Sequence, residues 1–437
     1  MTIQTVILAA GCGRRMHTDL PKVLHKIGGK TLLSHVLESA FSLSSHHAPI
    51  VIYGHQGELV KSAIHDDRIK WVEQKEQRGT GHALQQALPF INQDDHVLIL
   101  YGDVPLISTH TLEHLVHQTP KNALGMLTAN LAEPTGYGRI KRDYDQAIVG
   151  IVEERDATIE EKRITEINPG IYVVSGAHLH AWLPQLTDHN QQKEFYLTDI
   201  ISYAVASNIP IHAVNVMKHE EIMGVNDLSQ LAKLERAFQY MQAEKLMHQG
   251  VTFIDPHRFD LRGELIVGKN VTIDVNVVIE GKVTLGDHCY IKPNTVIEGA
   301  TIGAHSTIGP FARIRPHTTL AEHVHLGNFV EVKNSQIESH TKVNHLSYIG
   351  DSDVGHRVIV GAGTITCNYD GANKHRTTIG DDAFIGSDTQ LVAPVTVAAG
   401  STIAAGSTVV KNTEAHALTL THTLNQRIKQ GWKRPGE

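Results

Sequence analysis

The sequence has few cysteines, and none of the spacings that usually give cysteine a structural role. Its 437 residues include only Cys12, Cys289 and Cys367, far apart in the chain, so neither a disulfide framework nor a zinc site is expected. No apolar run reaches the roughly 18 residues that a membrane helix requires. The apolar start TIQTVILAAG lacks the basic segment of a signal peptide. We therefore expect a cytoplasmic protein without a membrane partner.

A strong charge of either sign is missing too. The formal net charge is -7 and no tract of clustered Lys and Arg occurs, which argues against nucleic acid as a partner. The 30 histidines are dispersed along the chain, and we interpret nearly all of them as surface side chains. The length is sufficient for two or three domains, each with its own core.

What the sequence does contain is a repeat, because an aliphatic residue returns every six positions between residues 267 and 409. This period fits short strands joined by tight turns, with one inward aliphatic side chain per turn. It predicts a parallel β-helix of about eight coils, each of about 18 residues. Three five-residue steps and one long excursion fall at the same corner of the predicted coil: 297 to 302, 332 to 337, 349 to 354, and 366 to 379. We expect a single loop to protrude there.

Residues 2–225 alternate β-rich apolar runs with helical patterns, which predicts a mostly parallel sheet covered on both faces. The expected strands are 5–10, 49–54, 96–103, 122–129, 148–153 and 171–174, and the expected helices are 32–40, 80–88 and 109–117. Ligands of such sheets bind beyond the carboxyl ends of the strands. The residues that follow each strand are therefore the candidates for a site.

The first strand is followed by a glycine turn with two arginines. Gly11 and Gly13 permit close approach of the backbone to a phosphate chain, and Arg14 and Arg15 add positive charge. The turn lacks the third glycine of a dinucleotide fingerprint and the ending of a P-loop, so neither assignment fits. Lys22 is placed to reach the same phosphates, although an ordinary surface lysine is the alternative.

Two further segments of this region carry polar groups at strand ends. Gln74 and the Gly79–Thr80–Gly81 sequence precede a helix, where free backbone N–H groups and an amide side chain would read a base or sugar. Asp103 ends an apolar strand, where a carboxylate either binds a divalent metal or serves a turn or helix cap. Asn226 is placed to offer an amide oxygen to the same metal.

A helical pattern separates the two regions. Its apolar positions are Leu228, Leu231, Leu234, Phe238, Met241 and Met247. Asn226 or Asp227 would cap its start and Gly250 would end it. We therefore predict a sheet domain over 1–225, a linker helix over 226–250 and a β-helix domain with a tail over 251–437.

On the predicted β-helix, Arg315 and Lys333 occupy the same position of hexapeptides one coil apart. Stacking places two cations about 5 Å from each other, which indicates either an anion bound between them or two splayed, solvated side chains. His345 lies at a turn near that face on the following coil. It is either structural or a general base beside a phosphate site.

Twelve motifs follow one another in the order in which a known family carries them: LAAGxGxRM, DLPKVLH, GTGHA, YGDVPL, PTGYGRI, EINxGIY, GVND, FDLRG, IGPFAR, NFVEVK, GAGTITCNYDGANK and GSDTQLVAPV. Over nearly its whole length the chain resembles the bacterial bifunctional N-acetylglucosamine-1-phosphate uridyltransferase / glucosamine-1-phosphate acetyltransferases. The nucleotide loop alone indicates only a sugar-nucleotidyltransferase, whereas GAGTITCNYDGANK is highly specific for this family.

The resemblance implies a Rossmann-like nucleotidyltransferase domain, a long helix and a left-handed β-helix, assembled as a homotrimer. It also implies two reactions. In the β-helix domain, acetyl-CoA acetylates glucosamine 1-phosphate. In the sheet domain, the resulting N-acetylglucosamine 1-phosphate attacks the α-phosphorus of UTP, with Mg²⁺ as cofactor, giving UDP-N-acetylglucosamine and pyrophosphate.

The resemblance further implies roles for individual residues. The nucleotide sugar would contact Leu8, Ala9, Ala10, Gly11, Lys22, Gln74, Gly79, Thr80, Tyr101, Gly102, Asp103, Gly138, Glu153, Asn168 and Asn226. Arg15 and Lys22 would act on the triphosphate, and Asp103 with Asn226 would hold Mg²⁺. In the second site His345 would accept the amine proton. The acceptor sugar phosphate would contact Arg315, Lys333, Tyr348 and Lys374, and acetyl-CoA would contact Ala362, Asn368, Tyr369, Ser387 and Ala405.

Some positions depart from the family pattern. Cys12 and Arg14 stand where Lys and Thr are usual, Ile359 replaces an Asn that contacts the acceptor sugar, and His422 replaces an Arg near the coenzyme. The β-helix is also about one coil shorter than is usual. Three hypotheses stay open: a bifunctional enzyme, a uridyltransferase whose acetyltransferase site has decayed, and a uridyltransferase whose β-helix only supports trimer formation.

Overall fold

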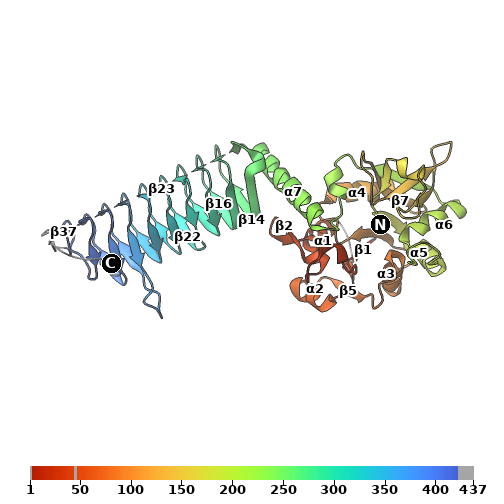
Figure 1. The fold of residues 1–437 in the computed structure, drawn as a ribbon, viewed down its shortest axis with the longest axis horizontal. Coiled ribbons are helices and arrows are strands. Elements are labelled where there is room, and N and C mark those ends of the chain that lie inside the picture. Colours follow the sequence, from red (N-terminus) through yellow and green to blue (C-terminus); the bar gives the residue numbers. More distant parts are fainter. Residues whose placement is uncertain (1, 44–46, 422–437) are drawn as a thin grey trace, which may run out of the picture. The chain divides into compact units, whose positions relative to one another are not determined.

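The computed structural model describes residues 2–43 and 47–421. The chain divides into two compact units, Met1–Phe238 and Gln239–Glu437, drawn in Figure 1. Within the part of the chain that is described, no helix has the length and apolar character needed to cross a membrane.

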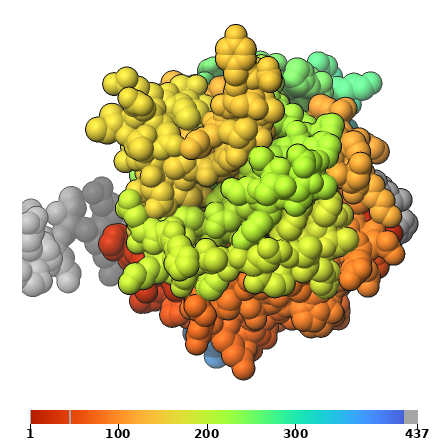
Figure 2. All heavy atoms as spheres, turned by 90° about the vertical axis from the view of Figure 1, so that its right-hand side faces the viewer, coloured from red at the N-terminus to blue at the C-terminus, as the bar shows by residue number. Residues whose placement is uncertain are grey.

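The first unit contains one large sheet with the strand order β5-β4-β1-β6-β11-β7-β10-β8-β9, and β12 pairs with β7. Its strands are β1 (Ile3–Leu8), β4 (Ile50–Tyr53), β5 (Lys70–Glu73), β6 (His96–Tyr101), β7 (Leu124–Asn130), β8 (Gly138–Arg142), β9 (Ile148–Val152), β10 (Glu166–Asn168), β11 (Tyr172–Ser175) and β12 (Ile211–Asn215). A hairpin of β8 and β9 projects from the surface, yellow-orange in Figure 2.

The sheet is mixed, so the expectation of a mostly parallel sheet was wrong. Strands β5, β4, β1 and β6 run parallel, but β11 runs antiparallel to both of its neighbours, β6 and β7. Strands β10, β8 and β9 also pair in antiparallel fashion. An apolar run predicts a buried strand but carries no information on its direction, because both directions bury the same side chains.

Helices cover both faces of this sheet, as expected. They are α1 (Leu32–Ser42), α2 (Gly57–Ala63), α3 (Thr80–Ala87), α4 (Thr109–Gln118), α5 (Gly176–Trp182) and α6 (Ile200–Ala206). Successive residues of β1 point to opposite faces: Ile7 belongs to the core that includes α1 and α4, and Val6 and Leu8 to the core that includes α3, α5 and α6. Side-chain oxygens of Thr31 and Ser108 cap α1 and α4, each at 3.1 Å from a backbone N–H.

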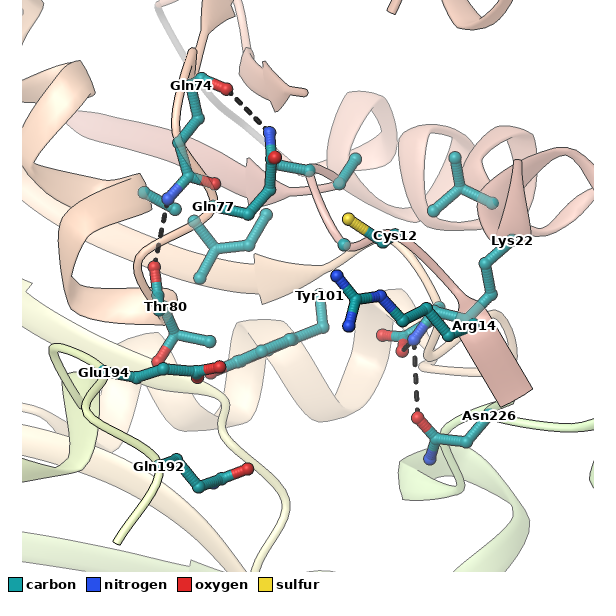
Figure 3. A pocket seen from close by; sticks show the side chains of 18 of the residues that line it. Cys12, Arg14, Lys22, Gln74, Gln77, Thr80, Tyr101, Gln192, Glu194 and Asn226 are labelled. Atoms are coloured by element: carbon teal, nitrogen blue, oxygen red, sulfur yellow. Dashed lines mark hydrogen bonds and ion pairs between the residues drawn. The ribbon is translucent and has the colours of Figure 1, made fainter. Parts of the chain in front are cut away.

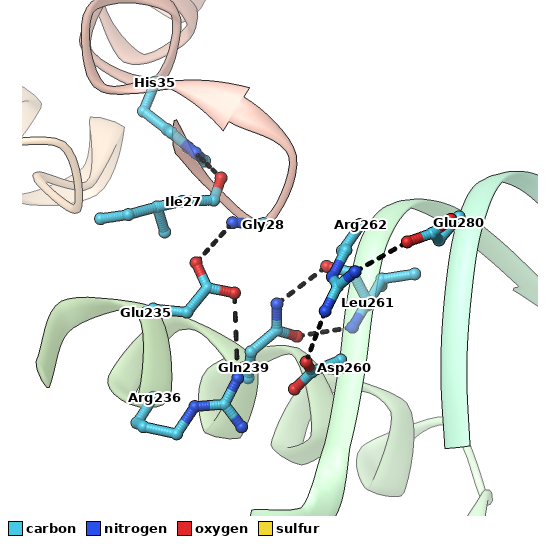
Figure 4. Close-up of polar contacts among 10 residues, drawn as sticks. All are labelled: Ile27, Gly28, His35, Glu235, Arg236, Gln239, Asp260, Leu261, Arg262 and Glu280. Atoms are coloured by element: carbon cyan, nitrogen blue, oxygen red, sulfur yellow. Dashed lines mark hydrogen bonds and ion pairs between the residues drawn. The ribbon is translucent and has the colours of Figure 1, made fainter. Parts of the chain in front are cut away.

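The predicted linker helix is α7 (Leu228–His248), and the boundary between the units falls within it. Asp227 caps its start, accepting a hydrogen bond from the Gln230 N–H at 2.8 Å, and Gly250 follows its end with a φ of 95°. In the first unit, Gly28 donates its N–H to Glu235 at 2.9 Å (Figure 4). A Cβ at Gly28 would lie 2.1 Å from the Phe238 ring, so this contact requires glycine.

The second unit is a parallel β-helix, as the six-residue period predicted. One face carries ten strands, from β13 (Thr252–Phe253) to β37 (Leu418–Thr419), and the other two faces belong to one 15-stranded sheet. The two faces are joined because β14 (Phe259–Val267) and β16 (Val277–Leu285) bend around a corner at Gly263 and Gly281. The aliphatic residues of the repeat from Ile273 to Val409 are 3% exposed or less. They form one continuous core.

The irregular steps lie at one corner, as expected. This corner carries Gly299, Asn334 and Asp351, each with a positive φ near 50°, where the chain passes to the next face in fewer residues. The long excursion leaves the same corner between β30 (Ile365–Cys367) and β31 (Thr377–Ile379). At the start of this unit, the Gln239 side chain bonds the backbone N–H and C=O of Leu261 at 2.7 and 3.0 Å (Figure 4).

Candidate active sites

A cavity of about 570 Å³ lies at the carboxyl ends of β1, β5 and β6 in the first unit (Figure 3). It is lined by eleven of the fifteen residues predicted to contact a nucleotide sugar: Leu8, Ala9, Ala10, Gly11, Lys22, Gln74, Gly79, Thr80, Tyr101, Asp103 and Asn226. Parallel strands that end at one edge bring these residues together although they lie far apart in sequence. Gly102, Gly138, Glu153 and Asn168 lie outside this lining.

Several lining residues were not predicted. They are Val23, Gln77, Ala83, Arg155, Gln192 and Glu194, and the two departures Cys12 and Arg14 also face the cavity. In Figure 3 the guanidinium of Arg14 points into the cavity. Arg15, the expected catalytic arginine, does not line the cavity and instead donates to Asn226 Oδ1 at 2.8 Å. Gln192 and Glu194 come from a loop without regular periodicity, so no pattern in the sequence indicated them.

One corner of the cavity gathers two oxygens around a cation. Lys22 Nζ forms an ion pair with Asp103 Oδ2. It also lies 3.4 Å from Asn226 Oδ1, a contact that Figure 3 shows. The Lys22 and Asp103 side chains are only 14% and 15% exposed. A carboxylate and an amide oxygen that already converge on a positive charge are a suitable pair of ligands for Mg²⁺, which would take the place of the ammonium.

The glycine turn packs directly on Lys22. Gly13 has a φ of 59°, and a Cβ there would lie 2.8 Å from the Lys22 Cβ, so a larger residue would displace the lysine. Gly11, by contrast, has open space around its Cα and leaves the cavity accessible. The turn therefore shapes this end of the cavity through the position of Lys22.

The start of α3 differs from the expectation in one respect. Gly81 donates its N–H to Phe195 at 2.8 Å, so this group is not free for a ligand. Gln74 is buried, and its amide nitrogen donates to the Gly79 carbonyl at 3.1 Å. A residue near position 195 that covers the helix start could not be foreseen from the local sequence. The Gln74 carbonyl oxygen is the group left to read a ligand.

Of the four predicted residues outside the main cavity, Glu153 lines a smaller cavity, and Gly138 and Asn168 lie on neighbouring paired strands. Glu153 accepts a hydrogen bond from Thr198 at 3.0 Å and lines a cavity of about 240 Å³. Burial raises the pKa of Glu153, and the Thr198 hydrogen bond offsets only part of this effect. Gly138 packs against the same carboxylate. Asn168 is 7% exposed, with its amide nitrogen held by Tyr172 at 2.6 Å.

In the second unit, Arg315 and Lys333 stack on adjacent coils as predicted, since the Arg315 N–H donates to Val332 at 2.8 Å. Arg315 has a countercharge within the chain, which neither alternative anticipated, because it pairs with Glu331 at 2.9 Å. Lys333 forms no such pair among the described residues, although its charge helps to lower the pKa of the buried Asp351 carboxyl. The Glu331 carboxylate thus reduces the repulsion between the two stacked cations without a bound anion.

His345 heads a line of small residues. Val343, Val360, Ile385 and Ile403 pair with one another on successive coils. The residue two positions after each of them therefore occupies the same place on its coil. These residues are His345, Ala362, Ser387 and Ala405. His345 Nδ1 lies 3.0 Å from Asn328 Oδ1, which accepts a hydrogen bond from the protonated Nδ1. In that tautomer Nε2 carries the lone pair, which is the form a general base requires.

The protruding loop carries the predicted residues Asn368, Tyr369 and Lys374, and Tyr348 lies on the strand Tyr348–Gly350. Tyr369 and Lys374 form an antiparallel bridge, and Asp370 Oδ1 accepts the N–H groups of Ala372 and Asn373 at 2.8 and 2.6 Å. Tyr369 is 60% exposed. At the base of the loop, Asn368 lies 3.4 Å from the hydroxyl of Tyr348. These bonds give the loop a defined shape.

Of the two departures in the second unit, the structure describes one. Ile359 is 45% exposed and pairs with Lys342 and Phe384 on the outer surface. His422 lies outside the described residues.

Comparison with known families separates the two units clearly. Residues 5–193 match the MobA-like NTP transferase domain. Residues 265–299, 299–334 and 376–411 match the bacterial transferase hexapeptide (six repeats). The first unit contains a nucleotidyltransferase domain. The second unit is a left-handed β-helix of hexapeptide repeats, a repeat type named for bacterial transferases.

Two solved structures resemble the nucleotidyltransferase domain weakly. A putative glucose-1-phosphate thymidylyltransferase from Bacillus anthracis is 17% identical, with a TM-score of 0.43 over 54% of this chain and 94% of that chain. The inositol-1-phosphate CTP transferase from T. maritima is 13% identical, with a TM-score of 0.41 over 53% and 94%. Neither likeness is strong enough to support a substrate.

Proposed function

We propose that the protein is a bifunctional enzyme that makes UDP-N-acetylglucosamine. Its β-helix would transfer an acetyl group from acetyl-CoA to glucosamine 1-phosphate, and its nucleotidyltransferase domain would join the product to UMP from UTP. The observation that carries the proposal is the cavity at the ends of β1, β5 and β6, where Asp103 and Asn226 converge on one cation beside a glycine turn. The hexapeptide repeats support the second activity.

Nucleotidyl transfer requires positioning and charge neutralisation more than covalent catalysis. The phosphate oxygen of N-acetylglucosamine 1-phosphate would attack the α-phosphorus of UTP, and the bond to the β-phosphate would break, releasing pyrophosphate. Lys22 and Arg14 line one end of the cavity, and Arg15 is bound to Asn226 of the same lining. These three cations would neutralise the triphosphate. Gln74 would read the base from the other end. Asp103 and Asn226 would hold Mg²⁺, which supplies further charge neutralisation when bound.

Acetyl transfer would take place along the line of small residues that His345 heads. Nε2 of His345 would take a proton as the glucosamine amine attacks the thioester carbonyl, and the coenzyme thiolate would leave. Arg315, Lys333, Tyr348 and Lys374 would bind the sugar phosphate. Ala362, Ser387 and Ala405 present small side chains, so the coenzyme would lie against the coils without steric hindrance, beside Asn368 and Tyr369.

We also propose that the chain forms a homotrimer through its β-helix. Phe311 and Phe329 stack at 5.2 Å on one corner, and Leu346 follows on the next coil. These side chains are 48%, 54% and 61% exposed, which is unusual for a continuous apolar column. Light scattering would measure the mass: three times the chain mass of 48.0 kDa is expected, and a monomer would contradict the proposal.

A second candidate function is nucleotidyl transfer alone, with the β-helix as a scaffold. The observation in its favour is Ile359, an exposed apolar residue at a position where an amide would bind the acceptor sugar. One assay on the full-length protein separates the two candidates. Coenzyme A release is followed with a thiol reagent in the presence of acetyl-CoA and glucosamine 1-phosphate, and pyrophosphate formation is measured with UTP and N-acetylglucosamine 1-phosphate.

Release of coenzyme A that depends on the sugar phosphate would support the bifunctional enzyme. Pyrophosphate formation without such release would support the scaffold. If neither reaction occurred, both candidates would be wrong.

A further inference from the structure

Asp351 is a buried carboxylate at the edge of the proposed acetyl-transfer site, and the reaction as described above does not use it. It is 4% exposed and lies between β27 (Tyr348–Gly350) and β28 (Ser352–Val354), with a φ of 48°. Its backbone carbonyl accepts the N–H of Thr377, at the end of the protruding loop, at 3.2 Å. A charge in this position must be balanced by donors to be stable.

The side chain of Asp351 receives two amide N–H groups. Asn334 Nδ2 donates to Oδ1 and Asn368 Nδ2 donates to Oδ2. An ionised carboxylate only accepts hydrogen bonds, so Asn368 must turn its nitrogen toward Asp351 and its oxygen away. Among the described residues the Asn368 oxygen accepts no hydrogen bond, and this atom is not fully buried. It is therefore accessible to a ligand.

Asp351 is also negatively charged at neutral pH. Burial raises the pKa of this carboxyl, but the hydrogen bonds from Asn334 and Asn368 and the charges of Lys333 and Lys374 together lower it below its ordinary value. The two lysines are those proposed to bind the phosphate of the acceptor sugar. The charge of Asp351 therefore acts on the same lysines, while its Oδ2 holds the amide nitrogen of Asn368.

We propose that Asp351 is a positioning residue of the acetyl-transfer site, which holds the Asn368 oxygen toward the coenzyme so that it accepts an amide N–H of the pantetheine arm. This inference rests on the proposed acetyl transfer. A ligand that approached Asn368 with an acceptor would be disfavoured, because the amide cannot turn over without losing its bond to Asp351. The competing explanation is that Asp351 has only a structural role, in which its backbone carbonyl bonds the Thr377 N–H and fixes the end of the loop.

The test is Asp351→Asn in the full-length protein, which keeps the shape and removes the charge. An asparagine offers either end of its amide to Asn368, so the orientation of Asn368 is no longer imposed. The Kd for coenzyme A, measured by titration calorimetry, is expected to rise about tenfold, the loss of one well-placed hydrogen bond. The KM for glucosamine 1-phosphate should not rise, because Lys333 and Lys374 lose a neighbouring negative charge.

Two matched variants complete the experiment. Asp353→Asn removes an exposed carboxylate of the same coil, which pairs with Arg376, and should leave both constants unchanged. Asn368→Ala should raise the Kd for coenzyme A as Asp351→Asn does, and the double variant should lose no more than either single one. Additive losses would mean that Asp351 acts independently of Asn368 and would overturn the proposal.

The remaining outcomes separate this inference from the proposed function. An unchanged Kd in Asp351→Asn overturns the positioning role, and so does a parallel rise in Kd and KM with a lower melting temperature, which is the result expected of loop closure alone. If the wild-type protein binds coenzyme A but releases none from acetyl-CoA, acetyl transfer is wrong, and the Kd comparison still decides the role of Asp351. If the wild-type protein does not bind coenzyme A, both are wrong.

Discussion

The two units build their candidate sites in different ways. In the nucleotidyltransferase domain, the cavity collects residues from the ends of several strands, and neighbours such as Lys22 and Asn226 are 204 positions apart. In the β-helix, neighbours such as His345, Ala362 and Ser387 share one position of a repeat on successive coils. A periodic fold thus converts sequence spacing directly into distance, whereas an α/β sheet requires the whole topology before its site exists.

The largest effect on this comparison is expected from Asp103→Ala. Loss of the carboxylate that pairs with Lys22 should lower pyrophosphate formation by about a thousandfold, because both the proposed metal ligand and the partner of the lysine disappear. Coenzyme A release should be unchanged. The control Asp66→Ala removes a surface carboxylate paired with Arg68 and should leave both reactions intact. Loss of both activities in Asp103→Ala would show that the sites do not work separately.

His345→Ala should have the reverse effect. Coenzyme A release should fall by about a hundredfold, the usual contribution of a general base, while pyrophosphate formation stays at the wild-type level. His340→Ala is a suitable control, because His340 is an exposed histidine stacked at 4.7 Å on His323 of the neighbouring coil. A wild-type rate in His345→Ala would rule out the general-base role.

Leu326→Ala tests whether the two cores are energetically separate. This fully buried residue of the β-helix should cost about 2–5 kcal/mol of unfolding free energy in its own unit. Scanning calorimetry should show a lower transition for the β-helix and an unchanged one for the nucleotidyltransferase domain, whose cores contain other residues. A joint shift of both transitions would contradict this separation.

Ile359→Asn sharpens the choice between the bifunctional enzyme and the scaffold. An amide at this exposed position should add one hydrogen bond to the acceptor sugar and lower the KM for glucosamine 1-phosphate about fivefold. Leu418→Asn, a 62% exposed residue on the same face, is the control and should have no effect. If Ile359→Asn leaves the KM unchanged, this position does not contact the sugar.

The smallest effect is expected from Glu153→Gln. Burial raises the pKa of Glu153 above its ordinary value of 4.5, so its ionised form at pH 7 costs folding free energy. The neutral glutamine should raise the unfolding free energy at pH 7 by about 1 kcal/mol. The gain should disappear as the pH falls below 4.5, where Glu153 is neutral in both states. Urea titrations at both pH values measure this, and equal stabilities at pH 7 would contradict it.

Much of the fold could be predicted, because local patterns carried it. Helices expected at 32–40, 80–88 and 109–117 are observed as α1, α3 and α4 with nearly the same bounds. The hexapeptide period placed the inward side chains of the β-helix, and the short steps placed its irregular corner. Strand direction in the first unit could not be predicted, because β11 has the same apolar composition in either direction.

The candidate sites were predicted less completely. Glycine turns and strand ends indicated most of the lining of the cavity in the first unit, but Gln192 and Glu194 reach it from a loop whose path depends on tertiary packing. The occupied N–H of Gly81 depends on the same loop. In the β-helix, the stacking of Arg315 on Lys333 followed from the repeat, whereas the ion pair of Arg315 with Glu331 and the burial of Asp351 near Lys333 did not.

The sequence by itself determined the division of the chain into a sheet region, a helix and a β-helix, and it determined the strand ends where chemistry-bearing residues gather. The reason is that hydrophobic periodicity and turn residues act locally. Only the tertiary structure decided which donors and charges meet. Lys22 forms an ion pair with Asp103, the Gly28 N–H donates to Glu235, and the Asn368 amide donates to Asp351. Such pairs join residues between 17 and 207 positions apart, and their geometry exists only after the chain has packed.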